Sequence, residues 1–508
     1  MEKYLSILKA MYNQANSAGN CVSGFCRYMN EFMAPYLLAA NYFSNVEMDK
    51  LPGTHPLEGF ISYAGLMNFN HDVGSRAIIS SMKAMSDFSN MELKKAMDAL
   101  FNTLLKGDVA DGSEDGFLAF TERQAVMTEM LARGYPQAIQ EIESEFGFGF
   151  ERGENRKVAE TDRFTLYQIL PIDPQTEVRA DGKPILILPP YVLGANILGF
   201  LPREQRSYAH CFANLGIPTY IRTMKDIETT PAVQLVTGEE DARDTRLFCE
   251  KLMAAHGRPV TLNGYCQGGY MAVCSVLSGE LDGVVDALIT CVSPMDGTRS
   301  QGFEQFFGML PKRFNELMYG TKTLPNGNRV ADGTLMGWVY KLKSIEAEFP
   351  IVAFLRDLMM FNPQFGRPPK VSKTAAAINY WLQYERSDLP LAITRMSFDS
   401  YNIPVTGDGT LPVKLFGRPL NFKRIQEKGL PWLICYGEKD DLVEKETALA
   451  PLDHIPVEVA PFPKGHVAIA TSWSHPTSAY ALHTRFGEGK YRGPVRFQLD
   501  LDEMGSTP

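Results

Sequence analysis

Six residues, Gly264-Tyr265-Cys266-Gln267-Gly268-Gly269, constrain the fold of this chain more than any other feature. They directly follow the apolar run Val260-Thr261-Leu262 and lead into a segment with helical periodicity, so they predict a tight turn between a buried strand and a helix. Such a turn presents its central side chain at a helix N-terminus, which favours the thiolate form of a cysteine and offers a backbone N–H to an oxyanion. The pattern therefore predicts a nucleophile elbow with Cys266 as the attacking residue.

Short apolar runs alternate with amphipathic helices from about residue 164, as expected for a parallel α/β sheet. The alternation stops between about residues 297 and 425, a stretch rich in aromatic residues and Met, and then resumes. An insertion between core strands of an open sheet lies above the strand ends, where ligands bind, so we expect a cap insertion there. The predicted strands are 185–188, 218–222, 260–262, 287–292, 432–436 and 457–459, and the predicted helices between them include 204–214 and 239–257.

The first 160 residues show helical periodicity and no catalytic motif. Ser89-Asn90-Met91-Glu92 has the spacing of a capping box and predicts a helix that begins there and ends before Gly107. A second helix is predicted from Thr121 to Gly134. We therefore expect a helical N-terminal domain, residues 1–160, that serves packing or association, and a catalytic domain, residues 161–508, that carries the cap at 297–425.

A cysteine nucleophile needs a base, and the histidines differ in how well their positions suit that role. Gly465-His466-Val467-Ala468 follows the strand predicted at 457–459, so His466 lies at the same sheet edge as the elbow. His454 and His475 remain alternatives, because position in a loop is the only criterion that separates them from His466. The other five histidines fit helix or surface positions: His55, His71, His210, His256 and His483.

Two adjacent acids, Asp440 and Asp441, follow the strand predicted at 432–436, where the residue that orients the base belongs. The apolar pair Leu442-Val443 is expected to pack beneath this loop, and its register selects Asp440. Counting forward from Gly437 selects Asp441 instead. We predict Asp440 as the acid and keep Asp441 as the alternative.

Composition excludes several classes of function. The 508 residues include 50 Lys and Arg against 59 Asp and Glu, and no dense basic run would neutralise the phosphates of a nucleic acid. The eight cysteines are too scattered for a disulfide scaffold, and Cys21 and Cys26 lack the second pair of a zinc site, so we expect no metal. Residues 184–202 are uncharged but contain prolines and glycines, which favour a buried strand and loop over a transmembrane segment. The N-terminus shows no signal peptide, which predicts a cytoplasmic enzyme or binding protein.

Several motifs in the same order resemble the polyhydroxyalkanoate synthases, a family with the α/β-hydrolase fold, between about residues 150 and 470. Gly264 to Gly269 is similar to their Gly-Tyr-Cys-x-Gly-Gly box, and Asp440-Asp441-Leu442-Val443 to their Asp-His-Ile-Val, which again selects Asp440. The other matching segments are Phe150-Glu151-Arg152-Gly153-Glu154-Asn155, Ile187-Leu188-Pro189-Pro190-Tyr191, Tyr380-Trp381, Ser387-Asp388-Leu389-Pro390, Leu415-Phe416-Gly417-Arg418-Pro419-Leu420 and Gly465-His466-Val467-Ala468.

This resemblance implies an acyltransferase that polymerises (R)-3-hydroxyacyl-CoA through an acyl thioester on Cys266, with coenzyme A only as the leaving group and no other cofactor. His466 would act as the base, Asp440 would orient it, and the backbone N–H groups of Gln267 and Val192 would form the oxyanion hole. The expected partners are the growing polyester chain or a granule surface and a second copy in a homodimer, in the cytoplasm or on granules. Two alternatives remain: a polyester depolymerase or acyl-CoA thioesterase with the same triad, and a non-catalytic granule-associated binding protein.

Overall fold

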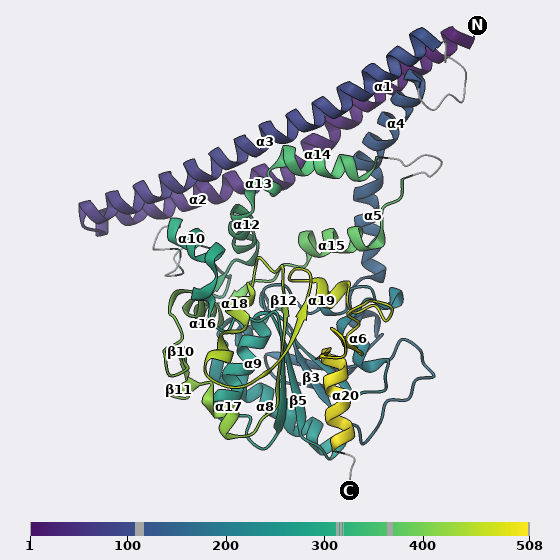
Figure 1. Ribbon diagram of the computed structural model, residues 1–508. Coiled ribbons are helices and arrows are strands. Elements are labelled where there is room, and N and C mark those ends of the chain that lie inside the picture. Colours follow the sequence, from purple (N-terminus) through teal and green to yellow (C-terminus); the bar gives the residue numbers. More distant parts are fainter. Residues whose placement is uncertain are drawn as a thin grey trace. The chain divides into compact units, whose positions relative to one another are not determined.

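The structure is a computed structural model that describes residues 2–106, 116–310, 314, 317, 320–362 and 369–505. The chain divides into two compact units (Figure 1). The helical unit comprises Met1–Ile142, Met309–Pro311 and Leu335–Tyr380, and the sheet unit comprises Glu143–Gly308, Lys312–Thr334 and Trp381–Pro508. None of the helices in the described part of the chain combines the length and the hydrophobicity needed to cross a membrane.

An eight-stranded sheet forms the centre of the sheet unit, in the order β1-β2-β4-β3-β5-β6-β12-β13. The first three strands in this order pair antiparallel, and all pairs from β4 to β13 are parallel. With the elbow after β5 and helices against the sheet, this is the predicted α/β-hydrolase fold. The strands are β1 Arg156–Glu160, β2 Phe164–Ile169, β3 Ile185–Leu188, β4 Thr219–Met224, β5 Val260–Tyr265, β6 Val285–Cys291, β12 Trp432–Gly437 and β13 Glu458–Phe462.

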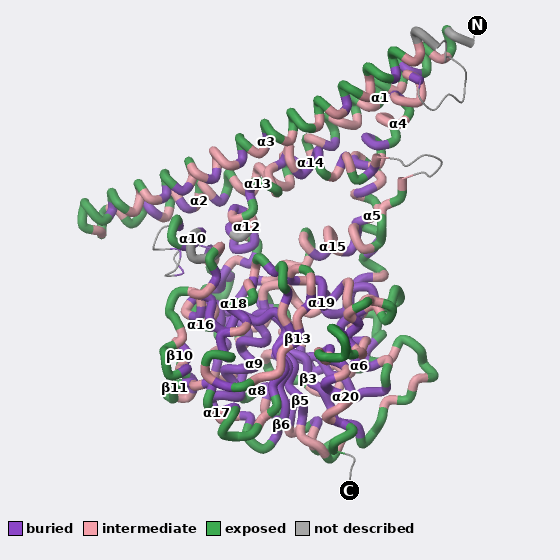
Figure 2. The backbone as a smooth tube through the Cα atoms, in the orientation of Figure 1, coloured by how far each residue is buried: buried purple, intermediate pink, exposed green. Residues whose placement is uncertain are grey.

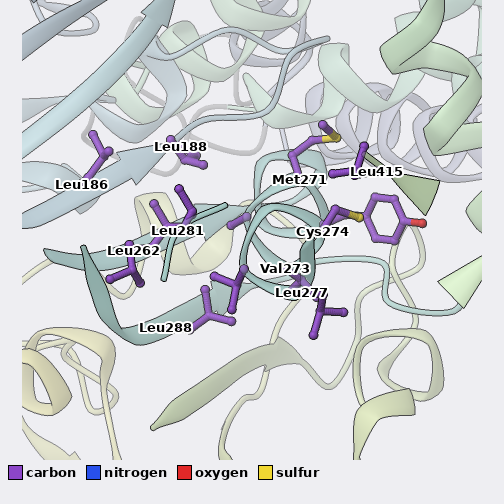
Figure 3. Close-up of a cluster of buried hydrophobic side chains, with 14 of the residues drawn as sticks. Leu186, Leu188, Leu262, Met271, Val273, Cys274, Leu277, Leu281, Leu288 and Leu415 are labelled. Carbon is purple, nitrogen blue, oxygen red and sulfur yellow. The ribbon is translucent and has the colours of Figure 1, made fainter. Parts of the chain in front are cut away.

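The core of the sheet unit lies between these strands and the helix that follows the elbow, α9 (Gln267–Ser278). Every residue of β3, β5 and α9 is buried, and β3 is apolar throughout, as expected for a strand covered on both faces. Figure 3 shows leucines of the strands beside Met271, Val273 and Leu277 of α9. Burial of this helix fixes the position of its N-terminus, where Cys266 lies.

The other helices of the sheet unit connect the strands. Helix α8 (Gly238–His256) confirms the predicted acidic start, and Thr237 and Glu240 form a capping box there. The sequence analysis missed the two antiparallel strands, β1 and β2. The remaining principal elements are α6 Tyr208–Ala213, α16 Leu391–Asn402, α17 Lys423–Glu427, α18 Lys445–Ala448, α19 Ala468–Thr471, α20 Pro494–Met504 and the hairpin of β10 Thr410–Leu415 and β11 Arg418–Asn421.

The helical unit is built mainly from long helices, and Figure 2 shows its buried and exposed residues. Its principal helices are α1 Glu2–Tyr28, α2 Ala34–Lys50, α3 Pro56–Lys106, α4 Phe117–Glu129, α5 Tyr135–Glu141, α12 Gly333–Lys343, α13 Ile345–Glu348, α14 Pro350–Met360 and α15 Lys373–Tyr384. Most residues of the last four belong to this unit.

Two predicted helix ends in this unit are wrong. No helix begins at Ser89, because α3 runs through it without a break, and Glu92 is a buried ion-pair partner of Arg123, with Oε2 and Nη2 3.0 Å apart. The second predicted helix does not stop at Gly134, because a π-helical turn at Met130–Gly134 continues into α5. Pro136 lies in the first turn of α5, where a missing N–H costs little.

The predicted domain limits differ from the compact units at two places. Residues 143–160 belong to the sheet unit, where Asn155 Nδ2 donates to Phe148 O at 2.6 Å and Asn155 Oδ1 accepts from Leu170 N at 3.0 Å. The insertion predicted at 297–425 does not form one body, because Leu335–Tyr380 joins the N-terminal helices. Aromatic contacts explain this division, since Phe354 packs edge-on against Phe25 and Tyr28.

Candidate active site

Cys266 occupies a strained backbone position between β5 and α9. Its φ of 52° and ψ of −125° lie in a region that side chains with a Cβ rarely adopt, as a nucleophile elbow requires. Its backbone N–H donates to Cys291 O of the neighbouring strand β6 at 2.8 Å, which ties the turn to the sheet. The predicted elbow is therefore present, with the cysteine as the N-cap residue of α9.

The three glycines around Cys266 are required by close packing. A Cβ on Gly264 would lie 2.3 Å from Gly269 Cα, so the turn itself has no space for a side chain. A Cβ on Gly268 would lie 2.2 Å from Leu188 O at the end of β3, and one on Gly269 would lie 1.9 Å from Ser293 Oγ. Because these glycines lack a Cβ, the start of α9 can lie directly against the end of β3 and the segment after β6.

Asp440 and His466 form the second part of the site. His466 Nδ1 and Asp440 Oδ2 are 2.8 Å apart, and both residues are buried. Asp440 Oδ1 accepts hydrogen bonds from the backbone N–H groups of Leu442 at 2.9 Å and Val443 at 2.8 Å. The apolar pair after the acid thus positions its carboxylate, while Asp441 is exposed. The geometry pairs Asp440, and not Asp441, with the histidine.

Tyr265 connects the histidine loop to the elbow, because its hydroxyl donates to His466 O at 2.8 Å. Since Tyr265 directly precedes Cys266, this hydrogen bond joins the loop after β13 to the end of β5. Nε2 of His466 is buried and has no hydrogen-bond partner within the part of the chain that the structure describes. An imidazole with one nitrogen held by a carboxylate and the other available is arranged as a general base.

The electrostatics of His466 distinguish it from the other buried histidine. Burial lowers the pKa of His210 to about 4. Burial acts in the same direction on His466, but the charges of Asp440 and Cys266, together with the hydrogen bond to Asp440, outweigh it and hold the pKa of His466 well above its ordinary value. The site thus favours an imidazolium between a carboxylate and a sulfur.

The two alternative histidines have other neighbours. His454 stacks on Phe422 with ring centroids 6.0 Å apart, and His475 Nδ1 is 2.9 Å from the hydroxyl of Thr477. Neither contact involves the elbow or Asp440.

The two residues proposed for the oxyanion hole lie at the same sheet edge. Gln267 is the first residue of α9, and Val192 lies in the turn that follows β3. Because β3 and β5 are parallel neighbours, both positions follow adjacent strand ends. The role of their N–H groups stays a prediction.

A buried polar network supports the turn that carries Val192, and the sequence analysis missed it. Tyr191 donates to Asp241 Oδ2, which also pairs with Arg222 Nη2 at 2.7 Å. All three side chains are buried, and burial together with the Asp241 charge raises the pKa of Tyr191 well above its ordinary value. The signal in the sequence was Arg222, a charged residue inside a buried strand, β4.

Residues of the predicted insertion that remain in the sheet unit contact the loops of the site. Ser397 Oγ of α16 accepts from Gln267 Nε2 at 2.7 Å. Trp381 Nε1 donates to Leu193 O at 3.2 Å, in the loop after β3. The sequence offered Trp381 as a motif residue, but nothing in it singled out Ser397.

No protein-family model and no curated protein matches this chain. Among solved structures, it is similar to a carboxylesterase of the thaumarchaeon Nitrososphaera gargenis, with 12% identity over 62% of this chain and 92% of that one and a TM-score of 0.35. Carboxylesterase CesB of Bacillus subtilis shows 11% identity over 66% and 92%, with a TM-score of 0.34. Brefeldin A esterase, a bacterial homologue of human hormone-sensitive lipase, shows 14% identity over 73% and 87%, with a TM-score of 0.37.

Proposed function

We propose that this chain is an acyltransferase of the polyhydroxyalkanoate synthase type, which forms an acyl thioester on Cys266 from (R)-3-hydroxyacyl-CoA. The observation that carries the proposal is an elbow cysteine at the sheet edge where His466 Nδ1 lies 2.8 Å from the buried carboxylate of Asp440. The resemblance of residues 150–470 to the synthases supplies the substrate class.

In the first step, the Cys266 thiolate attacks the carbonyl carbon of the acyl-CoA thioester. The new C–S bond forms, the bond to the coenzyme A sulfur breaks, and the imidazolium of His466 protonates the departing thiolate. The Gln267 and Val192 N–H groups would stabilise the oxyanion between these events. One thioester replaces another, so the step needs little driving force.

In the second step, the hydroxyl of a further 3-hydroxyacyl unit attacks the thioester on Cys266. Neutral His466 takes the hydroxyl proton, an ester bond forms and the Cys266 sulfur leaves as the thiolate. Asp440 keeps the accepting nitrogen in the correct tautomer and stabilises the imidazolium that results.

Hydrolysis on the same residues is the second candidate, with water as the acceptor in place of a hydroxyl. The exposed fractions of Cys266 and His466 are only 9% and 8%, and this burial restricts a hydroxyl acceptor at least as much as water. A synthase transfers the acyl group to a hydroxyl, whereas a depolymerase or thioesterase transfers it to water. The acyl product therefore distinguishes the two functions.

The test supplies (R)-3-hydroxybutyryl-CoA and measures both free thiol and the acyl product. We expect thiol release with a polyester product, no release by Cys266→Ala, and unchanged release by Cys26→Ala, a variant of an exposed cysteine in α1. Free 3-hydroxybutyrate as the sole product would replace the synthase with a hydrolase. No thiol release and no acylation of Cys266 by any acyl-CoA would favour the non-catalytic alternative.

A further inference from the structure

The turn after β3 is anchored by a polar network in the interior of the sheet unit. Tyr191, Arg222 and Asp241 have exposed fractions of 5%, 2% and 0%, and they come from the turn, from β4 and from α8. The Tyr191 hydroxyl donates to Asp241 Oδ2, and Arg222 Nη2 donates to the same oxygen at 2.7 Å. All three residues belong to the sheet unit, so the network is complete within that unit.

Further contacts hold the network in place. Arg222 Nη1 donates to Thr245 Oγ1 at 2.6 Å, and Arg222 Cζ lies 4.1 Å from the centroid of the Phe164 ring. The Phe164 ring in turn packs edge-on against the ring of Tyr191, with centroids 6.3 Å apart. The Tyr191 side chain is therefore fixed by a charged acceptor at its hydroxyl and by an aromatic contact along its ring.

Stability alone does not account for the burial of these groups. Removing a charged pair from water costs free energy that the attraction between the charges repays only in part, and apolar residues of similar volume often give equal or greater stability. In some proteins, buried polar groups are retained because they fix a single conformation. The segment that gains a fixed conformation here is the turn at Tyr191, which directly precedes Val192.

Close packing places the elbow against the same turn. A Cβ on Gly268 would lie 2.2 Å from Leu188 O and 2.6 Å from Pro189 O, so the backbone just after Gln267 touches the end of β3 and the residue that follows it. Within the described residues, neither the Gln267 N–H nor the Val192 N–H donates a hydrogen bond to another group of the chain. Both donors are thus available to an oxyanion.

We propose that the Tyr191 hydroxyl is a positioning group for the oxyanion hole: its hydrogen bond to Asp241 fixes the direction of the Val192 N–H relative to the Gln267 N–H. Donors that stabilise an oxyanion act because they are already in place when the charge develops, so a turn that is free to move loses part of this stabilisation. The inference rests on the proposed function only in that Cys266 accepts an acyl group, and it holds for a synthase and a hydrolase alike.

The test compares two reactions of Cys266 that differ in their need for an oxyanion hole. With p-nitrophenyl acetate, the thiolate attacks the carbonyl carbon, an oxyanion forms, and p-nitrophenolate leaves as the thioester is completed. With iodoacetamide, the same thiolate displaces iodide from a saturated carbon, and no oxyanion forms. Release of p-nitrophenolate measures the acylation rate, and mass spectrometry of the peptide that contains Cys266 measures the alkylation rate.

Tyr191→Phe removes only the hydroxyl and leaves the pair of Arg222 and Asp241 in place. Loss of a whole oxyanion-hole donor lowers the rate about 10²–10³-fold. Because this change only misplaces one donor, we expect the maximal acylation rate to fall at least about tenfold, with less than about a twofold change in KM and in the alkylation rate. Tyr220→Phe is the matched control, since the exposed fraction of Tyr220 is also 5% and its hydroxyl lies 2.9 Å from His256 Nε2, and it should leave both rates unchanged.

A triple variant keeps the proposal testable if the loss of one hydroxyl disturbs folding. Tyr191→Phe, Arg222→Met, Asp241→Leu replaces the whole network with apolar side chains, a change that often leaves stability unchanged or raises it. We expect this variant to remain folded by circular dichroism and to show the same slow acylation beside unchanged alkylation.

Acylation of folded Tyr191→Phe, or of the folded triple variant, at the unmodified rate would overturn the proposal. An equal loss of acylation and alkylation would also overturn it, because the thiolate itself would then be disturbed. An unmodified protein that accepts the acyl group of p-nitrophenyl acetate but of no acyl-CoA would refute the proposed function alone, since the variants could still be compared. An unmodified protein that p-nitrophenyl acetate does not acylate would overturn both.

Discussion

Replacing Asp440 by asparagine should inactivate the proposed acyl transfer far more than the same change at Asp441. Asp440 accepts three hydrogen bonds, two at Oδ1 from the backbone of Leu442 and Val443 and one at Oδ2 from His466. Asparagine has one acceptor oxygen, so if it satisfies the two backbone groups, its NH₂ group faces His466 Nδ1. The imidazole then adopts the tautomer that carries its proton on Nε2, and in this tautomer Nε2 cannot accept a proton from Cys266.

The same loss in serine triads lowers the rate about 10⁴-fold, which corresponds to about 5.5 kcal/mol of transition-state stabilisation. We expect a loss of that size for Asp440→Asn and less than about threefold for Asp441→Asn, whose side chain is exposed. Initial rates of thiol release from (R)-3-hydroxybutyryl-CoA measure both variants, and circular dichroism checks their folding. A near-normal Asp440→Asn beside an inactive Asp441→Asn would refute the assignment of the acid.

Three further predictions concern the elbow and the histidine. Cys266→Ser should retain less than about 1% of the thiol-release rate while remaining folded, because a base matched to a thiol is poorly matched to a hydroxyl of much higher pKa; substantial turnover by a folded Cys266→Ala variant would contradict the covalent mechanism. Gly269→Ala should lower the free energy of unfolding in urea by about 2 kcal/mol or more, since its Cβ would lie 1.9 Å from Ser293 Oγ, whereas Gly407→Ala, with open space around its Cβ, should change it little. The pKa of His466 is raised on folding, so its contribution to stability is full below its unfolded pKa of about 6.5 and is lost as pH rises through the folded value. Urea unfolding at low and high pH should therefore show a stability advantage over His466→Asn that shrinks as pH rises, and a constant advantage would show that the imidazolium is not stabilised.

Local sequence was sufficient to predict those features that depend on residues close together in the chain. The buried strands and the elbow could be predicted because continuous apolar runs and glycines at fixed offsets specify a strand, a tight turn and a helix without reference to distant residues. His466 and Asp440 could be located for a related reason: the carboxyl ends of parallel strands meet at one sheet edge, so a loop position along the chain implies a position in space. The choice of Asp440 over Asp441 also agrees with a local feature, the two N–H groups of Leu442 and Val443.

Contacts between segments far apart in the sequence determined the features that the sequence analysis predicted wrongly. Glu92 has the spacing of a capping residue relative to Ser89, but both residues lie in the interior of α3. There Glu92 forms an ion pair with Arg123, which lies on another helix. The insertion at 297–425 divides because Phe354 packs against Phe25, more than 300 positions earlier in the chain. Such contacts depend on which apolar faces meet, and helical periodicity shows that a face is apolar without showing what covers it. The sequence by itself thus determined most of the sheet strands and the order of the candidate site residues, whereas tertiary packing determined helix continuity and the division into units.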